Sequence, residues 1–323
     1  MASNPCCGAL VRWSGRWPLD VSSPKASVAV AFSAGADSTA LLLAAVGHWP
    51  GRVVAFHVHH GLQAAADDFE QQARSTCGAL GIPLRVVRVD AGCARGESPE
   101  DAARRARYAA LAEMALASNA VCVLLGQHAD DQAETVLIAL SRGSGLPGLS
   151  AMAEHFMRHG VAFGRPLLAV AAKDLRAAMV AQGQAFVDDP SNRDQRFTRN
   201  RVRASLMPAW ADTFPGFREA LARTARHAAQ AQSLLDELAD IDAQSVGEPP
   251  QILGLQALRR ERQANVLRHW LKRTAQVAAT EAQMLELLDQ IDACRTRGHR
   301  IRIKVANGHV ERFGTGLVFT PPI

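Results

Sequence analysis

A short loop of small, hydroxyl-bearing and acidic residues is the first feature of this sequence that could do chemistry. The loop, Ser33-Ala34-Gly35-Ala36-Asp37-Ser38-Thr39, lies between the apolar runs 28–32 and 40–46. This order predicts a strand, a tight turn and a helix, and the N–H groups and dipole at such a helix N-terminus favour a bound anion. The loop lacks the G-x-x-x-x-G-K-[ST] spacing of the common nucleotide-binding loop. A phosphate site and an ordinary serine-capped turn are both open at this point.

A second polar cluster follows the apolar run 121–125 and reads Gly-Gln-His-Ala-Asp-Asp-Gln-Ala-Glu-Thr over residues 126–135. In a helix that begins near Ala129, Asp131 and Glu134 are three residues apart and therefore share one face. Two carboxylates beside a phosphate loop repel each other unless a cation, either a metal ion or a substrate ammonium group, lies between them. The alternative is a solvated acidic first turn that only complements the helix dipole.

Strand-like and helix-like segments alternate through the first half of the chain. We expect strands at 28–32, 53–58, 84–89 and 121–125, and helices at 37–46, 65–80, 99–118 and 129–140. This alternation predicts an α/β domain with a doubly wound parallel sheet. Ligands of such sheets bind beyond the carboxyl ends of the strands, where the strand order reverses. Both polar clusters follow a strand end, so they are predicted to converge on one crevice.

Two later loops carry cations. Residues 141–150 form a glycine-rich loop with Arg142, which can close over phosphates or serve as a plain connector. A second loop has five arginines within eleven positions, Arg193, Arg196, Arg199, Arg201 and Arg203. This density suits contacts to phosphates of ATP or of an RNA backbone, with a solvated basic face as the alternative.

The composition changes beyond residue 215, which predicts two domains. Residues 1–215 form the expected catalytic domain, with an irregular or partly helical lead-in over 1–25 and a last helix at 170–182. Residues 216–323 form a smaller, mostly helical α+β domain. Its expected elements are a linking helix at 217–243, helices at 255–274 and 280–293, and an antiparallel hairpin or meander within 299–320.

The overall composition bounds the class of protein. The 323 residues are 48% hydrophobic and 21% charged, as in a globular cytoplasmic protein, and the net charge of +5 is consistent with a polyanionic partner. The six cysteines form no C-x-x-C pair, which predicts reduced structural thiols. No apolar run reaches the length of a signal peptide or a membrane span, so no membrane partner is expected.

The loop at 33–38 resembles the S-G-G-x-D-S pyrophosphate loop of the N-type ATP pyrophosphatase, or PP-loop, superfamily, which has a Rossmann-like fold. More narrowly, the chain from residue 28 onward resembles the tRNA(Ile)-lysidine synthetases, because several rare motifs recur in the order of that family. Besides the loop and the acidic cluster, these are the segments 57–62 (HVHHGL), 100–108, 142–149 (RGSGLPGL), 165–168 (RPLL), 189–192 (DPSN) and 199–203 (RNRVR).

Three positions depart from the pattern of the family. Ala34 stands where the family usually has a second glycine, so we expect a negative φ there, since a positive φ would strain alanine. His59 replaces the more usual asparagine, and Gln127 replaces the more usual histidine. None of these changes removes a charged catalytic group, so a working site is expected.

The resemblance implies a ligase that joins L-lysine to C2 of the wobble cytidine in the CAU anticodon of tRNA(Ile). ATP first adenylates the cytidine, and the reaction releases pyrophosphate and AMP. Magnesium is the expected metal ion, and no tightly bound prosthetic group is expected. The resemblance also implies homodimerisation, and it covers only the first C-terminal domain of the longer family members.

The residues that match the motifs take roles from the same resemblance. Asp37, Asp131 and Glu134 are the expected catalytic residues, with Asp37 facing the metal ion and Asp131 accepting a proton from the attacking lysine. Expected ATP contacts are Ser33, Ala34, Gly35, Ala36, Asp37, Ser38, Phe56, His57, Gly126 and Arg142, with the adenine on the backbone near Phe56 and His57. Expected lysine contacts are Asp131, Glu134, Arg104 and Arg107, where Arg104 or Arg107 holds either the lysine carboxylate or an ATP phosphate. Expected tRNA contacts are Arg193, Arg196, Arg199, Asn200 and Arg203. His128 either orients a phosphate oxygen or caps its helix.

Two other functions are weighed against this one. A tRNA thiolase of the same superfamily would adenylate a base and then deliver sulfur, which requires reactive cysteines, and Cys122 falls inside an expected strand. A catalytically inactive RNA-binding relative would keep the fold without turnover, and only Ala34 favours it.

Overall fold

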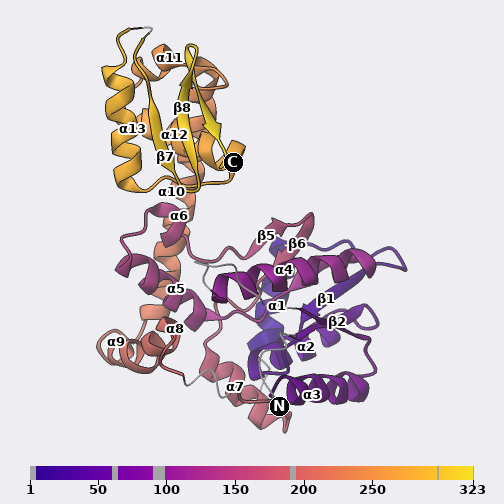
Figure 1. Cartoon of the computed structure of the whole chain (residues 1–323). Coiled ribbons are helices and arrows are strands. Elements are labelled where there is room, and N and C mark those ends of the chain that lie inside the picture. Colours follow the sequence, from indigo (N-terminus) through magenta and orange to yellow (C-terminus); the bar gives the residue numbers. More distant parts are fainter. Residues whose placement is uncertain (1–4, 60–64, 90–98, 190–193, 297, 323) are drawn as a thin grey trace. The chain divides into compact units, whose positions relative to one another are not determined.

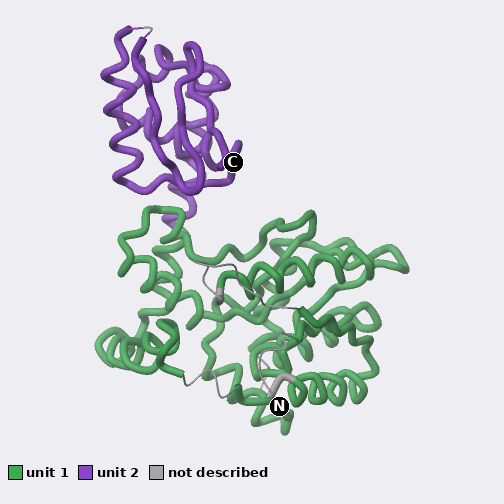
Figure 2. The backbone as a smooth tube through the Cα atoms, viewed as in Figure 1, with its two compact units in different colours: residues 1–226 green, residues 227–323 purple. Residues whose placement is uncertain are grey.

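The chain forms two compact units in the computed structural model, which describes residues 5–59, 65–89, 99–189, 194–296 and 298–322. Unit 1 comprises residues 1–226, and unit 2 comprises residues 227–323 (Figure 2). The units divide inside the long helix α10 (Phe217–Val246), whereas the sequence placed the domain boundary just before this helix.

Unit 1 contains a six-stranded sheet in the order β3-β2-β1-β4-β6-β5 (Figure 1). Every neighbouring pair is parallel except β5 and β6, which are antiparallel. The strands are β1 (Ser27–Ala31), β2 (Val53–His59), β3 (Leu84–Arg88), β4 (Ala120–Leu124), β5 (His155–Arg158) and β6 (Val161–Gly164). The strand order reverses between β1 and β4, where a doubly wound sheet binds its ligand. The predicted fold class is therefore confirmed.

Successive residues of the central strand β1 enter two different cores, because side chains alternate between the faces of a sheet. Val28 and Val30 pack in the core that also takes side chains of α1, α2, α3 and α7, whereas Ala29 packs in the core that takes side chains of α4. These helices and the helix after β4 are α2 (Ala36–His48), α3 (Ala65–Leu80), α4 (Pro99–Ala117), α5 (Ala129–Ser141) and α7 (Ala172–Ala181).

Strands β5 and β6 of unit 1 were not predicted, and helix α1 was expected only as part of an irregular or partly helical lead-in. Helix α1 (Pro5–Arg16) occupies part of that lead-in, and its Trp13 fits against β6, where a Cβ added to Gly164 would lie 2.4 Å from the indole ring. Strands β5 and β6 are joined by His159 and Gly160, both with positive φ, +50° and +74°. Two such residues form the favoured two-residue hairpin turn.

A helical run of three parts precedes α10 and carries most of the arginine cluster. Helix α8 (Thr198–Arg201) continues into the π-helical turn η2 (Val202–Leu206) and then into α9 (Met207–Thr213). A π-turn inserted between α-helical turns is often found at functional sites. A further short helix, α6 (Leu146–Leu149), lies in the expected glycine-rich loop.

Unit 2 packs helices against a three-stranded antiparallel meander with its own apolar core. The predicted helix at 255–274 is wrong as a single element, because the chain leaves the helix at residues 257–259 and begins a new one. The predicted Thr280 cap is confirmed, since its hydroxyl accepts the Gln283 N–H at 3.3 Å. The elements are α11 (Ile252–Gln256), α12 (Arg260–Ala275), α13 (Glu281–Ala293), β7 (Arg302–Val305), β8 (Gly308–Phe313) and β9 (Gly316–Thr320).

Two properties of the described residues concern membrane-spanning helices and the state of the cysteines. None of their helices is both long and apolar enough to cross a membrane. The cysteines among them are all free thiols, and only Cys7 of these is exposed.

Candidate active site

The loop between β1 and α2 is shaped by its own hydroxyl groups. Ser38 Oγ accepts the Ser33 N–H at 3.2 Å and donates to the Gly35 carbonyl at 3.1 Å, and Thr39 Oγ1 donates to the same carbonyl at 2.9 Å. Gly35 is the N-cap of α2 and provides no side-chain cap for the first N–H groups of the helix. Those groups are the donors that a helix N-terminus offers to an anion.

Ala34 has a φ of +65°, so the expected negative φ is wrong. The left-handed conformation costs an L-residue about 1–2 kcal/mol, and it persists here because the surroundings hold it. The Ala34 side chain is fully buried in the core of unit 1, and its carbonyl accepts the Val187 N–H at 2.9 Å. The loop therefore keeps the backbone turn for which the family usually uses glycine, at the cost of local strain.

The acidic cluster reaches the same place from the neighbouring strand. Gly126, just beyond β4, packs so closely that an added Cβ would lie 3.3 Å from the backbone nitrogen of Ser38. His128 caps α5, accepting the Asp131 N–H through Nδ1 at 3.4 Å, while Asp131 Oδ2 accepts the His128 N–H at 3.1 Å. The other ring nitrogen, Nε2, lies 3.5 Å from Asp37 Oδ2 and 3.5 Å from Asp131 Oδ2.

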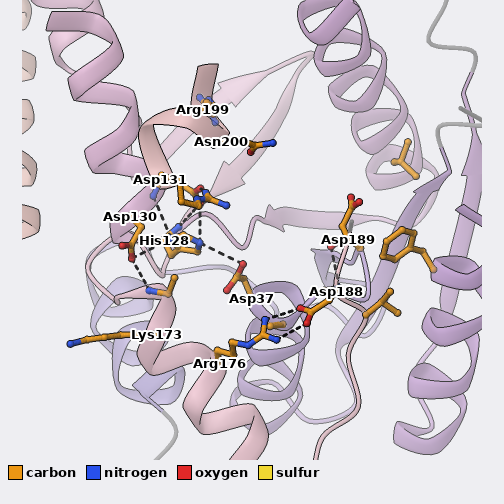
Figure 3. A pocket seen from close by; sticks show the side chains of 18 of the residues that line it. Asp37, His128, Asp130, Asp131, Lys173, Arg176, Asp188, Asp189, Arg199 and Asn200 are labelled. Carbon is orange, nitrogen blue, oxygen red and sulfur yellow. Dashed lines mark hydrogen bonds and ion pairs between the residues drawn. The ribbon is translucent and has the colours of Figure 1, made fainter. Parts of the chain in front are cut away.

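His128 therefore joins the loop to the acidic helix, as Figure 3 shows. Burial opposes a charge on this imidazole, but the hydrogen bond to Asp37 and the charges of Asp131, Asp37 and Asp130 outweigh burial and raise its pKa. Both clusters line one pocket of about 1090 Å³. The predicted convergence on a single crevice is confirmed.

The cation between Asp131 and Glu134 is a guanidinium group of the protein itself. Arg203, on the π-turn η2, places Nε 2.7 Å from Glu134 Oε1 and Nη2 3.1 Å from both Glu134 Oε2 and Asp131 Oδ1. The Glu134 side chain is 0% exposed, that of Asp131 is 17% exposed and that of Arg203 is 41% exposed. Burial raises the pKa of Glu134 against the opposing effect of Arg203. Of the two acids, Asp131 is the one that lines the pocket.

Asp130 fastens three helices together at the edge of the pocket, and the sequence did not identify it. Its Oδ2 accepts the Ala172 N–H at the start of α7 at 2.8 Å, and its Oδ1 lies 2.6 Å from Arg218 Nη2 at the start of α10. Burial opposes the charge of Asp130, but Arg218 and the Ala172 N–H outweigh it and lower its pKa. Lys173 and Arg176 also line the pocket and were not predicted to do so. Arg176 Nη2 forms an ion pair with Asp188 Oδ2 at 2.6 Å.

Comparisons with known proteins agree with this geometry. The model of the PP-loop domain matches residues 18–210, and that of the TilS substrate binding domain matches residues 251–317. A tRNA(Ile)-lysidine synthase of Polaromonas naphthalenivorans (strain CJ2) is 60% identical over 318 residues, which make up 98% of this chain and 95% of the relative. The chain belongs to the tRNA(Ile)-lysidine synthase family. The resemblance drawn from the motifs is thereby confirmed.

One further relative is longer than this chain, and a solved structure is similar to it only in fold. A tRNA(Ile)-lysidine synthase of Burkholderia pseudomallei (strain K96243) is 44% identical over 283 residues. These residues make up 85% of this chain and 58% of that relative. Among solved structures, the U34-tRNA thiolase NcsA from Methanococcus maripaludis with its [4Fe-4S] cluster matches with a TM-score of 0.58 and 16% identity. That match covers 69% of this chain and 77% of the thiolase. At this identity the likeness shows the fold alone.

The residues expected to bind ATP in this lysidine synthase relative are only partly gathered at the pocket. Ser33, Gly35, Ala36, Asp37 and His57 line it. The Phe56 side chain is fully buried in the core, so the adenine contact expected near Phe56 would involve its backbone alone. The His57 ring is fixed by a 2.8 Å hydrogen bond between Nδ1 and the Phe32 carbonyl. Arg142 lies at the C-terminal end of α5, which is the end opposite His128.

The residues expected to bind lysine through a carboxylate contact lie around Tyr108. The Arg104 and Arg107 guanidinium carbons are 5.3 and 6.0 Å from the centroid of the Tyr108 ring, and Arg165 donates to the Tyr108 hydroxyl at 3.1 Å. Arg165 also donates to Gln127 Oε1 at 3.0 Å, so the unusual glutamine serves here as an acceptor for a buried guanidinium.

The residues expected to bind tRNA lie in and before the helical run 198–213. Arg199 and Asn200 line the pocket together with Arg203, and Arg199 Nη2 lies 3.5 Å from Thr135 Oγ1. Arg196 is exposed and pairs with Asp194 at 2.7 Å. Arg193 lies outside the described residues.

Proposed function

We propose that this chain ligates L-lysine to C2 of the wobble cytidine in the CAU anticodon of tRNA(Ile), in two steps driven by ATP. Membership in the lysidine synthase family supports this activity. The single observation that carries the assignment of residues is the position of His128 Nε2, 3.5 Å from both Asp37 and Asp131. This contact supports the proposal that the loop at 33–38 and the acidic helix α5 serve one reaction.

In the first step the C2 oxygen of cytidine attacks the α-phosphate of ATP, which adenylates the base and expels pyrophosphate. The N–H groups of residues 36–38, for which α2 has no side-chain cap, are arranged to stabilise the charge that develops on the phosphates. Magnesium commonly binds through one or two carboxylates plus substrate phosphates, and the partly exposed Asp37 fits that donor set. No cluster of three possible metal ligands occurs among the described residues.

In the second step the lysine ε-amino group attacks C2 and AMP leaves. The amine arrives as ammonium and must lose a proton, and Asp131 is the acid exposed to the pocket that can accept it. Arg203 occupies the position between Asp131 and Glu134 in the structure. We therefore propose that lysine ammonium binds at these acids when the ATP phosphates attract Arg203 away from them.

The tRNA contacts follow the distribution of positive charge. Arg199, Asn200 and Arg203 face the pocket, so they are suited to the anticodon, while the exposed Arg196 is suited to the backbone nearby. Unit 2 carries the match to the TilS substrate binding domain and is the proposed second contact region. Homodimerisation stays a prediction.

The thiolase alternative is not favoured by the chemistry of the described cysteines. Cys122 lies in β4 with no exposure, and burial raises its pKa to about 12. Such a thiol is almost entirely protonated at neutral pH and is a poor nucleophile.

Incubation with labelled lysine, ATP and unmodified tRNA(Ile) transcript tests the proposal. We expect one lysine per tRNA, in the anticodon loop, with release of AMP and pyrophosphate. Replacement of lysine by a sulfur donor serves as the control. Turnover with sulfur but not with lysine, or no AMP release with all three substrates, would contradict the proposed function.

A further inference from the structure

An exposed phenylalanine, Phe197, precedes two residues that line the pocket. Phe197 is the N-cap of α8 and is 47% exposed, and the next helical residues include Arg199 and Asn200, which line the pocket. Consecutive Cα atoms are about 3.8 Å apart, so the backbone of Phe197 lies within about 8 Å of that of Arg199. Within the described part of the chain, no aromatic ring or guanidinium group covers the Phe197 ring.

Two exposed arginines lie on either side of Phe197 in the sequence. The Arg196 side chain is exposed although Asp194 holds it bidentately, at 3.0 and 2.7 Å. Arg201 is also exposed, and its Nη2 lies 3.3 Å from Thr198 Oγ1. An apolar face between two cations matches a nucleotide, whose base stacks on aromatic rings while its phosphate binds arginine. An apolar surface of a protein partner would leave the two arginines without counter-charges.

The partner must offer an unstacked base, which double-stranded RNA does not. The reacting cytidine has to leave the base stack of its anticodon loop to enter the pocket. The base next to it in the loop then loses a stacking partner. We propose that Phe197 is a stacking platform for an unpaired base adjacent to the reacting cytidine. This inference rests on the proposed function and adds to it a residue that recognises the loop by shape rather than by charge.

Binding of a fluorescein-labelled anticodon stem-loop RNA with a CAU loop tests the platform. Stacking on an aromatic side chain is worth enough that Phe197→Ala should raise the Kd about tenfold. Phe197→Trp should keep the Kd within about threefold, because it retains a flat ring, whereas Phe197→Leu should weaken binding nearly as much as alanine. The salt dependence should stay unchanged for all three, since no ionic contact is removed.

Phe214 provides a matched control. It is 57% exposed and lies at the other end of the same helical run, as the C-cap of α9. Phe214→Ala should leave the Kd unchanged. Melting temperatures of all variants show whether the fold is kept.

Four results would overturn the inference. The first three are binding by Phe197→Ala within about twofold of the wild-type protein, wild-type affinity for Phe197→Leu, and an equal loss of affinity for a duplex RNA of the same length. The fourth is the absence of any binding to the stem-loop. The assay needs neither ATP nor lysine, so the two failures are distinguishable: RNA binding through Phe197 without lysine incorporation would refute the proposed function, whereas lysine incorporation with no Phe197 contribution to binding would refute only this inference.

Discussion

Removal of the Arg203 guanidinium should leave two carboxylates without their cation. The structure gives Arg203 three contacts of 2.7–3.1 Å to Glu134 and Asp131, and Glu134 has no exposed surface. Loss of one partner of a fully buried ion pair costs about 3–5 kcal/mol, because the other charge stays buried. Arg203 is itself 41% exposed, so solvent screening lowers the expected cost of Arg203→Ala to about 2 kcal/mol.

The cost should depend on pH through Glu134, which faces Arg203, Asp131 and Arg199. Burial already raises the pKa of Glu134 above its ordinary 4.5, and loss of Arg203 must raise it further. An acid whose folded-state pKa is raised favours the folded state below its unfolded pKa and loses that contribution as pH rises through the folded pKa. The deficit of Arg203→Ala should therefore be small near pH 4.5 and grow toward about pH 8.

Urea unfolding at about pH 5 and about pH 8 measures this deficit. Glu134→Gln in the Arg203→Ala background should restore at least ~1 kcal/mol at the higher pH, because the buried charge is gone. Arg201→Ala, at an exposed arginine on the preceding turn, is the control and should cost less than ~0.5 kcal/mol. The reasoning is refuted if the double variant is no more stable than Arg203→Ala, or if the deficit shrinks as pH rises.

Three further predictions concern the loop, the tyrosine and the RNA. Gly126→Ala adds a Cβ 3.3 Å from Ser38 N, and overpacking costs about 1–3 kcal/mol of stability, so the melting temperature should fall by a few degrees. Because Ser38 belongs to the anion-binding loop, KM for ATP should also rise about tenfold, and an unchanged melting temperature and KM would contradict the close packing. Tyr108 is the single tyrosine of the chain, and Arg165 and Arg104 lower its pKa despite burial. In an ultraviolet titration the midpoint of phenolate formation should thus lie below pH ~10, and a higher midpoint would count against the arginine cluster. The affinity for tRNA should fall linearly with salt on logarithmic axes, with a slope that Arg199→Ala lowers by about 1; a flat response argues against docking through phosphates.

The elements of the sheet were readable from the sequence because buried parallel strands are continuous apolar runs. Strand β2 was expected at 53–58 and spans Val53–His59, and α3 was expected with the limits it has. Strand β6 escaped prediction because its four residues, Val-Ala-Phe-Gly, are too short to show a period. The bounds of helix α1 within the partly helical lead-in were not predicted, because its Gly8 and Gly15 weaken the helical pattern and its stability comes from packing of Trp13 and Leu10.

The candidate site was predictable only where its geometry follows from residues close together in the sequence or from the ends of predicted strands. Spacing along α5 placed Asp131 and Glu134 on one face, and the strand ends placed both clusters at one edge of the sheet. The cation between the acids was not predictable, because Arg203 is 69 residues from Glu134 and reaches it through tertiary packing. The same holds for Arg218 and Asp130, which are 88 residues apart. The φ of Ala34 was predicted wrongly, since the cost of strain in one residue was weighed without the core that holds it.

The partial reactions of Asp37→Asn and Asp131→Asn test most directly whether one crevice serves both steps. Pyrophosphate release is measured with ATP and tRNA alone, and incorporation of labelled lysine is measured with all three substrates. We expect Asp131→Asn to keep pyrophosphate release and to lose at least ~100-fold in lysine incorporation, since general-base catalysis contributes about 10²–10⁴-fold. We expect Asp37→Asn to lose both. Near-normal lysine incorporation by Asp131→Asn, or normal pyrophosphate release by Asp37→Asn, would contradict the proposed division of roles.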